Sequence, residues 1–106
     1  MGPATVELFE KEGAIVTADS SDLTETEKCQ DIVESAGIID ILIANLASEN
    51  FSGIPTSDLT DEDWNTAFDV MVHPLHKLSR AVIPQMVERQ AGKIIVYGSA
   101  SALKGM

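Results

Sequence analysis

The feature that most constrains the fold is the run of residues 39–44 (IDILIA), which is apolar at almost every position. A strand with one face in water alternates apolar and polar residues, whereas a strand buried on both faces does not. The run therefore predicts an inner strand of a parallel sheet. Two other short runs rich in β-branched residues, 14–18 (AIVTA) and 93–97 (KIIVY), predict two further strands.

Two helices are expected before this central strand. Pro3 suits the first turn of a helix, and Gly13 suits the left-handed residue that ends it. Thr24 and Glu27 have the spacing of a capping box, so they predict the start of a second helix, which ends at Gly37.

A long helix is expected over residues 61–90, where the periodic signal is strongest. Thr60 and the acidic residues after it favour a helix start, because carboxylates stabilise the positive end of the helix dipole. Apolar residues follow at steps of three and four: Trp64, Phe68, Met71, Leu75, Leu78, Val82 and Met86. Pro74 and Pro84 each remove a helix donor, so we expect a kink or loosening at each, and Gly92 is expected to close the helix.

The alternation of helices and strands predicts an α/β domain, a three-layer doubly wound parallel sheet of Rossmann-like type. Ligands of such sheets bind beyond the carboxyl ends of the strands. Three loops are expected to converge there: residues 19–22, 45–51 and 98–101. The sequence thus locates a candidate site without reference to any family.

Composition excludes several classes of function. The chain has 17 acidic and 7 basic residues and a net charge of −10, which disfavours binding to nucleic acid. It has no apolar run long enough to span a bilayer and no basic-then-apolar leader, so a membrane partner is not expected. The single Cys29 suits a reducing cytoplasm, which is the expected location.

Three positions could carry chemistry. Ser99 leaves the third strand between small residues, where its hydroxyl could meet a ligand or simply cap a turn. Asp19 could accept hydrogen bonds from a ribose hydroxyl or be a turn residue, and no Gly-x-Gly-x-x-Gly motif is present. His73 and His76 have a spacing that could hold a metal, but no third ligand is evident, so no metal site is expected.

Several segments resemble the short-chain dehydrogenase/reductase superfamily: residues 39–45 (IDILIAN), 63–64 (DW), 80–86 (RAVIPQM) and 92–99 (GKIIVYGS). Two segments depart from its oxidoreductases. Residues 44–47 read ANLA where those enzymes usually show Asn-Asn-Ala-Gly, and residues 69–71 read DVM where they carry Asp-Val-Asn. Residues 1–6 (MGPATV), 72–76 (VHPLH) and 96–100 (VYGSA) instead resemble one branch of the halohydrin dehalogenases.

This second resemblance implies a lyase that converts vicinal haloalcohols to epoxides and halide, or opens epoxides with small anions, without a nicotinamide cofactor or a metal. Ser99 would hold the substrate hydroxyl together with a Tyr and an Arg, and the Arg would lower the pKa of that Tyr. Four residues would line the substrate or halide pocket: Gly2, Asn45, Phe51 and Ser101.

The resemblance also implies that residues 1–106 form one partial domain, without the first strand of the fold and without the C-terminal half that holds the Tyr and Arg. Strands 14–18 and 39–44 would then flank an empty position, and we expect the chain alone to be unstable or to associate. The helix over 61–90 would form a homo-oligomer interface. Two alternatives remain: part of an oxidoreductase that binds NAD or NADP, or a non-catalytic interaction piece.

Overall fold

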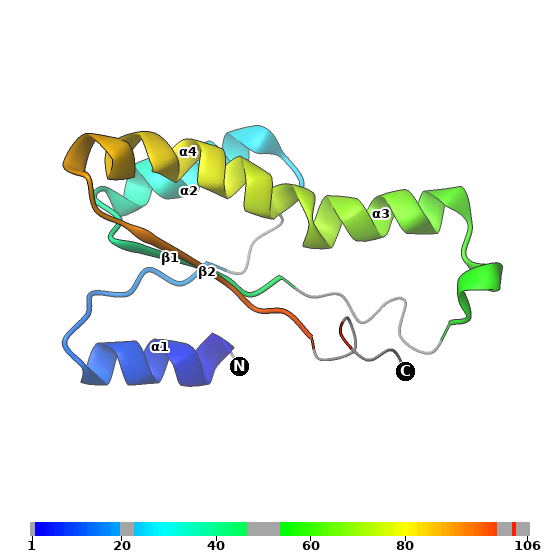
Figure 1. The fold of residues 1–106 in the computed structure, drawn as a ribbon, viewed down its shortest axis with the longest axis horizontal. Helices are drawn as coiled ribbons and strands as arrows, with labels where there is room; N and C mark the ends of the chain where they lie inside the picture. The colour runs from blue at the N-terminus through cyan, green and yellow to red at the C-terminus, as the bar shows by residue number, and fades with distance from the viewer. Residues whose placement is uncertain (1, 20–22, 47–53, 100–102, 104–106) are drawn as a thin grey trace.

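The computed structural model describes residues 2–19, 23–46, 54–99 and 103. Its centre is a parallel pair of strands, β1 (Ile41–Ala44) and β2 (Lys93–Val96), with Ile41 opposite Lys93 and Ala44 opposite Val96. Helix α1 (Gly2–Lys11) lies on one side of this pair (Figure 1), and helices α2 (Thr26–Ala36) and α4 (His73–Arg89) lie on the other. The predicted arrangement, helices on both sides of a parallel sheet, is confirmed.

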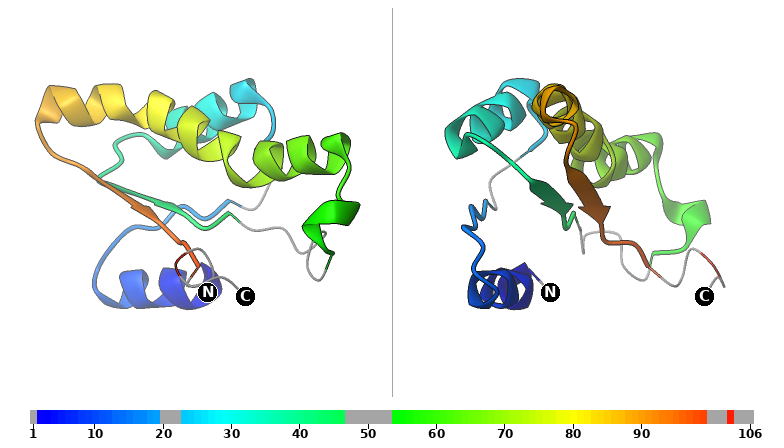
Figure 2. Two further views of the ribbon diagram at one scale, coloured as in Figure 1. Left: turned by 45° about the vertical axis from the view of Figure 1, so that its right-hand side comes forward. Right: turned by 60° about the vertical axis from the view of Figure 1, so that its left-hand side comes forward.

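The predicted strand over residues 14–18 is absent, because these residues form no ladder in the structure. The segment 14–19 runs in the same direction as β1, and Figure 2 places it on the β1 side of the sheet, away from β2. The side chain of Ile15 in this segment is fully exposed. A strand needs a neighbour for its backbone hydrogen bonds, and no strand among the described residues lies between this segment and β1.

The two predicted helix starts have different outcomes. The capping box at Thr24 is wrong: α2 begins at Thr26 after Glu25, which makes no side-chain cap. The start at Thr60 is confirmed for α3 (Asp61–Met71), which follows the short 3₁₀ helix η1 (Thr56–Asp58). The Asp63 N–H donates to Thr60 Oγ1 and the Thr60 N–H donates to Asp63 Oδ2, each at 3.1 Å.

The long helix predicted over residues 61–90 is interrupted at Val72, which separates α3 from α4. Pro74 occupies the first turn of α4, where its missing N–H costs no helical hydrogen bond. Helix α4 continues through Pro84, so no break occurs there. Gln90, with φ of 55°, is the left-handed C-cap, and the prediction that Gly92 closes the helix is wrong.

The hydrophobic core lies between α2, α4 and β1. Its buried cluster consists of Cys29, Val33, Leu78, Val82 and Met86, against which Leu23, Ile39, Leu42 and Ala81 pack. The apolar stripe continues onto α3 but is not covered there, since the side chains of Trp64 and Phe68 are 54% and 37% exposed. Strand β2 is exposed along its length because α4 packs on β1 rather than on β2.

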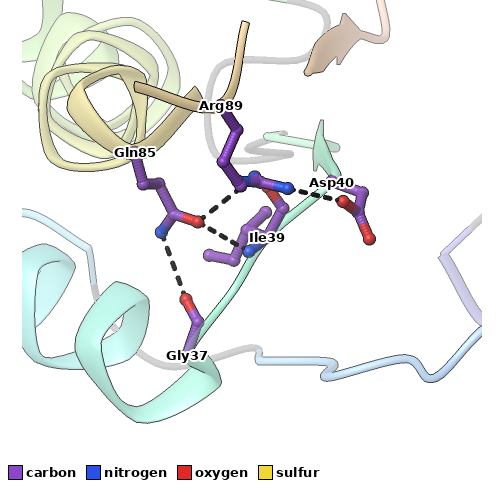
Figure 3. A network of polar contacts seen from close by, with 5 residues as sticks. All are labelled: Gly37, Ile39, Asp40, Gln85 and Arg89. Carbon is purple, nitrogen blue, oxygen red and sulfur yellow. Dashed lines mark hydrogen bonds and ion pairs between the residues drawn. The ribbon is translucent and has the colours of Figure 1, made fainter. Parts of the chain in front are cut away.

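A polar network joins the last turns of α4 to the residues before β1 (Figure 3). The Ile39 N–H donates to Gln85 Oε1 at 2.8 Å, and Gln85 Nε2 donates to the Gly37 carbonyl at 3.1 Å. Arg89 donates through Nη2 to the Ile39 carbonyl at 2.6 Å and through Nη1 to Asp40 Oδ1 at 2.8 Å. This network fixes where β1 begins relative to α4.

Candidate functional site

The carboxyl ends of the two strands bring several polar residues to one edge of the sheet. Asn45 directly follows β1, while Tyr97 and then Ser99 follow β2. Helix α1 begins at the same edge, because a Cβ built on Gly2 would lie 3.5 Å from Asn45 Nδ2. This position agrees with the general rule that α/β sheets bind ligands at the carboxyl ends of their strands.

Tyr97 connects this edge to α1. Its hydroxyl lies 2.7 Å from Thr5 Oγ1, and its backbone N–H donates to the Ala44 carbonyl at 3.1 Å. The tyrosine therefore extends the ladder of β2 and also fixes the first turns of α1 against the strand ends. Tyr97 was expected only as a strand residue, because no local pattern predicts its contact with Thr5, which lies 92 positions away in the sequence.

A cavity of about 1220 Å³ opens between the segment 14–19, β1, α1 and α2. At the carboxyl edge its lining includes Gly2, Asp19, Asn45 and Tyr97, and we call these four residues the carboxyl-edge site. Alongside β1 the lining is mainly apolar. The structure thus brings Asp19 and Asn45, which were expected on converging loops, to one cavity, and Gly2 also lines it.

The predicted catalytic residue Ser99 is not among the described residues that line this cavity. Ser99 is exposed and lies two residues beyond Tyr97, so it is not buried in the core. Phe51 and Ser101 lie outside the described residues. The chemical role of Ser99 therefore stays a prediction.

The remaining candidate groups do not form a reactive centre. His73 Nε2 lies 3.7 Å from Asp69 Oδ1 at the surface, and no group of three or more potential metal ligands occurs in the described ranges. Cys29 is buried, and its Sγ donates to the Leu23 carbonyl at 3.4 Å. Burial raises the pKa of the Cys29 thiol, although the nearby charges of Lys77 and Arg80 oppose this effect. The thiol is therefore a poor nucleophile at neutral pH.

The family of the chain follows from comparison with known sequences. The profile of the short chain dehydrogenase family matches residues 3–106, and the chain belongs to that family. It is 31% identical over 101 residues to dehydrogenase/reductase SDR family member 4 of the rabbit Oryctolagus cuniculus, an alignment covering 92% of the chain and 38% of the relative. It is 33% identical over 88 residues to an uncharacterized oxidoreductase of Bacillus subtilis, covering 80% and 33%.

Solved structures show the same fold. The L-sorbose reductase of Gluconobacter frateurii, solved with NADPH and L-sorbose, has a TM-score of 0.76 and 29% identity over 98% of this chain and 40% of its own. A 3-oxoacyl (acyl-carrier-protein) reductase of Agrobacterium tumefaciens, solved with NADP, has a TM-score of 0.74 and 25% identity over 98% and 41%. The Rossmann-like fold predicted from the sequence is confirmed. The chain spans about two fifths of the length of these proteins.

These comparisons correct two expectations. The relatives are named as oxidoreductases, so the finer resemblance to halohydrin dehalogenases is not supported. The expectation of no cofactor is wrong: the two structures contain NADPH and NADP, and a relative from Mycobacterium tuberculosis is named as NAD-dependent. The short segments that depart from the oxidoreductase pattern, residues 44–47 and 69–71, therefore do not indicate a different branch of the family. No described helix is long and apolar enough to cross a membrane.

Proposed function

We propose that this chain is the nucleotide-binding part of an NAD(P)-dependent oxidoreductase. The observation that carries the proposal is the meeting of the α1 N-terminus, Asp19 and Asn45 in one cavity at the carboxyl edge of a parallel sheet. A dinucleotide needs donors for its phosphates and an acceptor for its ribose hydroxyls, and these groups supply both.

The residues present fit such a cofactor. The first turn of α1 contains no acidic side chain, so its unpaired N–H groups and positive dipole end can attract a phosphate. Gly2 adds no side chain there, and a larger residue would project toward Asn45 and fill the approach. The bound nicotinamide would donate or accept the hydride. The residues of this chain would hold and orient the cofactor.

We further propose that the cofactor is NAD(H) rather than NADP(H). The Asp19 carboxylate can accept hydrogen bonds from both ribose hydroxyls of the adenosine, but it would repel a 2′-phosphate. Residues 17–25 contain no Lys or Arg that could neutralise such a phosphate. Ser99, at the exit from β2, would hydrogen-bond to the reacting oxygen of a carbonyl or alcohol substrate.

A homo-oligomer through α3 and α4 also stays a proposal. Its support is the uncovered aromatic pair of Trp64 and Phe68, whose ring centroids lie 5.3 Å apart on an exposed face. Large exposed aromatic side chains are typical of interfaces between subunits.

Titration of the chain with NADH and with NADPH, followed by cofactor fluorescence, tests the cofactor proposal. We expect tighter binding of NADH, because only NADPH places a phosphate beside Asp19. Asp19→Arg should reverse the preference, and Asp19→Asn should weaken it. The control Asp58→Asn, which removes an exposed carboxylate on η1, should change neither affinity. Equal binding of the two cofactors, unchanged by Asp19→Arg, would contradict the proposal.

A further inference from the structure

Tyr97 connects three elements of the fold at the carboxyl edge of the sheet. Its backbone N–H donates to the Ala44 carbonyl at the end of β1, at 3.1 Å, and its hydroxyl lies 2.7 Å from Thr5 Oγ1 on α1. Tyr97 follows β2 directly, and the start of α1 lies near the end of β2 (Figure 2). One residue therefore links α1 to both strands.

The contact between Thr5 and Tyr97 is important because buried apolar packing does not hold α1 in place. None of the side chains of α1 is buried, so the hydrophobic effect fixes the position of this helix only weakly. The two hydroxyls are partly buried, and 2.7 Å is the usual length of an O–H···O hydrogen bond. A hydroxyl that has lost part of its water needs such a partner, so the pair favours one placement of the helix.

The same pair lies in the cavity that contains the carboxyl-edge site. Thr5 and Tyr97 both line this cavity, together with Gly2 and Asn45. Gly2 lies in the first turn of α1, where the unpaired N–H groups would meet a cofactor phosphate, and Ser99 follows Tyr97 by two residues. The pair thus connects the helix that would bind the phosphate to the strand end that carries Ser99.

We propose that Tyr97 and Thr5 are a positioning pair for the nucleotide site, and that they couple phosphate binding at α1 to the exit from β2. The inference rests on the proposed function, since it requires that the first turn of α1 meets the cofactor phosphates. Tyr97 acts through Thr5 and through the helix, so it is a positioning residue and not a catalytic one. When a phosphate binds, the N–H groups of α1 adopt one position, and the hydroxyl pair then restrains the backbone that leads to Ser99.

The first experiment separates the hydroxyl of Tyr97 from its ring. Tyr97→Phe removes only the hydroxyl, and Thr5→Val replaces the threonine hydroxyl by a methyl group of similar size. Loss of one hydrogen bond that positions the helix should weaken NADH binding about threefold to tenfold in either variant. Thr5→Ser keeps the hydroxyl and should bind NADH like the native chain. Thr66→Val makes the same exchange at an exposed position of α3 and should not affect binding.

Adenosine distinguishes positioning of the phosphate site from general damage to the fold. It contains a base and ribose of NADH but no phosphate, so its binding does not depend on the N–H groups of α1. Calorimetry should therefore show unchanged adenosine affinity in Tyr97→Phe and in Thr5→Val. The double variant should lose no more NADH affinity than either single variant, because both changes remove the same hydrogen bond. Neither residue belongs to the buried core cluster, and far-UV circular dichroism checks that each variant is folded.

The coupling to β2 can be observed at Tyr97 itself, which is the single tyrosine of the chain. Incorporation of fluorotyrosine therefore gives one fluorine resonance. ADP, which contains phosphates but no nicotinamide, should shift this resonance, and adenosine should shift it much less. Thr5→Val should reduce the shift that saturating ADP produces. The amide resonance of Ser99 should respond to the two ligands in the same way.

Two results would overturn this inference alone. The first is binding of NADH by the native chain that Tyr97→Phe leaves unchanged. The second is an equal loss of NADH and adenosine affinity in Tyr97→Phe, which would identify a general effect on the fold. A fluorine resonance that bound ADP does not move would overturn the coupling to β2. If the native chain bound neither NADH nor ADP, the proposed function would fail, and this inference would fail with it.

Discussion

Replacement of Arg89 by alanine tests how α4 fixes the start of β1. The guanidinium, whose side chain is 30% exposed, donates to the Ile39 carbonyl at 2.6 Å and to Asp40 Oδ1 at 2.8 Å. Arg89→Ala removes both of these hydrogen bonds and also the longer one, at 3.4 Å, that Arg89 Nη2 donates to Gln85 Oε1. It leaves the Ile39 carbonyl without this donor, next to the hydrophobic core.

The two hydrogen bonds should contribute unequally. The Asp40 side chain is 82% exposed, so its ion pair with Arg89 contributes about 0–1 kcal/mol. A hydrogen bond from a charged donor to a carbonyl contributes about 1.5–3 kcal/mol, and the exposed position of this one favours the lower end of that range. We therefore expect Arg89→Ala to lower the free energy of unfolding by about 2 kcal/mol and Asp40→Ala by less than about 1 kcal/mol.

Urea unfolding of the two single variants and the double variant, followed by far-UV circular dichroism, measures these terms as a double-mutant cycle. The coupling free energy between Arg89 and Asp40 should be small. Arg89→Ala should therefore lower the free energy of unfolding by nearly the same amount when Asp40 has already been replaced by alanine. Arg89→Lys is the control, because it keeps the charge but cannot make both hydrogen bonds in the same geometry. If Asp40→Ala lowered the free energy of unfolding as much as Arg89→Ala does, the reasoning would be refuted.

Three further outcomes are expected. Val82→Ala, at a fully buried position, should lower the free energy of unfolding by about 2 kcal/mol in the same urea assay, whereas Val87→Ala, 68% exposed, should change it little. Gln90→Gly should raise it by about 0.5–1 kcal/mol because φ of 55° is strained for glutamine, and Gln90→Ala should give no gain. The pKa of Cys29 is raised by burial, so its contribution to stability is complete below the pKa of an unfolded cysteine, about 8.5, and is lost as the pH rises above it. Urea midpoints between pH 7 and 10 should fall more for the native chain than for Cys29→Ala, and a parallel fall in both would contradict this.

The parts of the fold that depend on local chemistry were predictable from the sequence. The Thr60 cap with Asp63 needs only residues three apart, and Pro74 restricts the backbone wherever it stands. The run at 39–44 predicted β1 because near-continuous apolar character requires two covered faces. Residues 14–18 have the same character, but a strand also needs a partner for its hydrogen bonds, which composition cannot supply.

The site was predictable in position but not in chemistry. Asp19 and Asn45 were expected at the carboxyl edge because parallel strands all end there, and both line the cavity. Gly2, which also lines it, was expected in the pocket only from the resemblance to halohydrin dehalogenases. The hydrogen bond between Thr5 and Tyr97 joins residues 92 positions apart, and no local pattern predicts such a contact. The cofactor was misjudged because a few short segments resembled another branch. Asp19 was already a possible ribose partner in the sequence, but its position in one cavity with the start of α1 is visible only in the structure.

Helix α1 has no buried side chain, whereas the buried residues of the described chain belong to α2, β1 and α4. Detaching α1 would therefore expose little apolar surface, and its opening would depend only weakly on denaturant. The helix that begins at the candidate phosphate site can then open and close while the rest stays folded. Ligand affinity at that site would include the free energy of closing α1, so a change that only tightens this helix against Tyr97 would strengthen binding without touching the ligand.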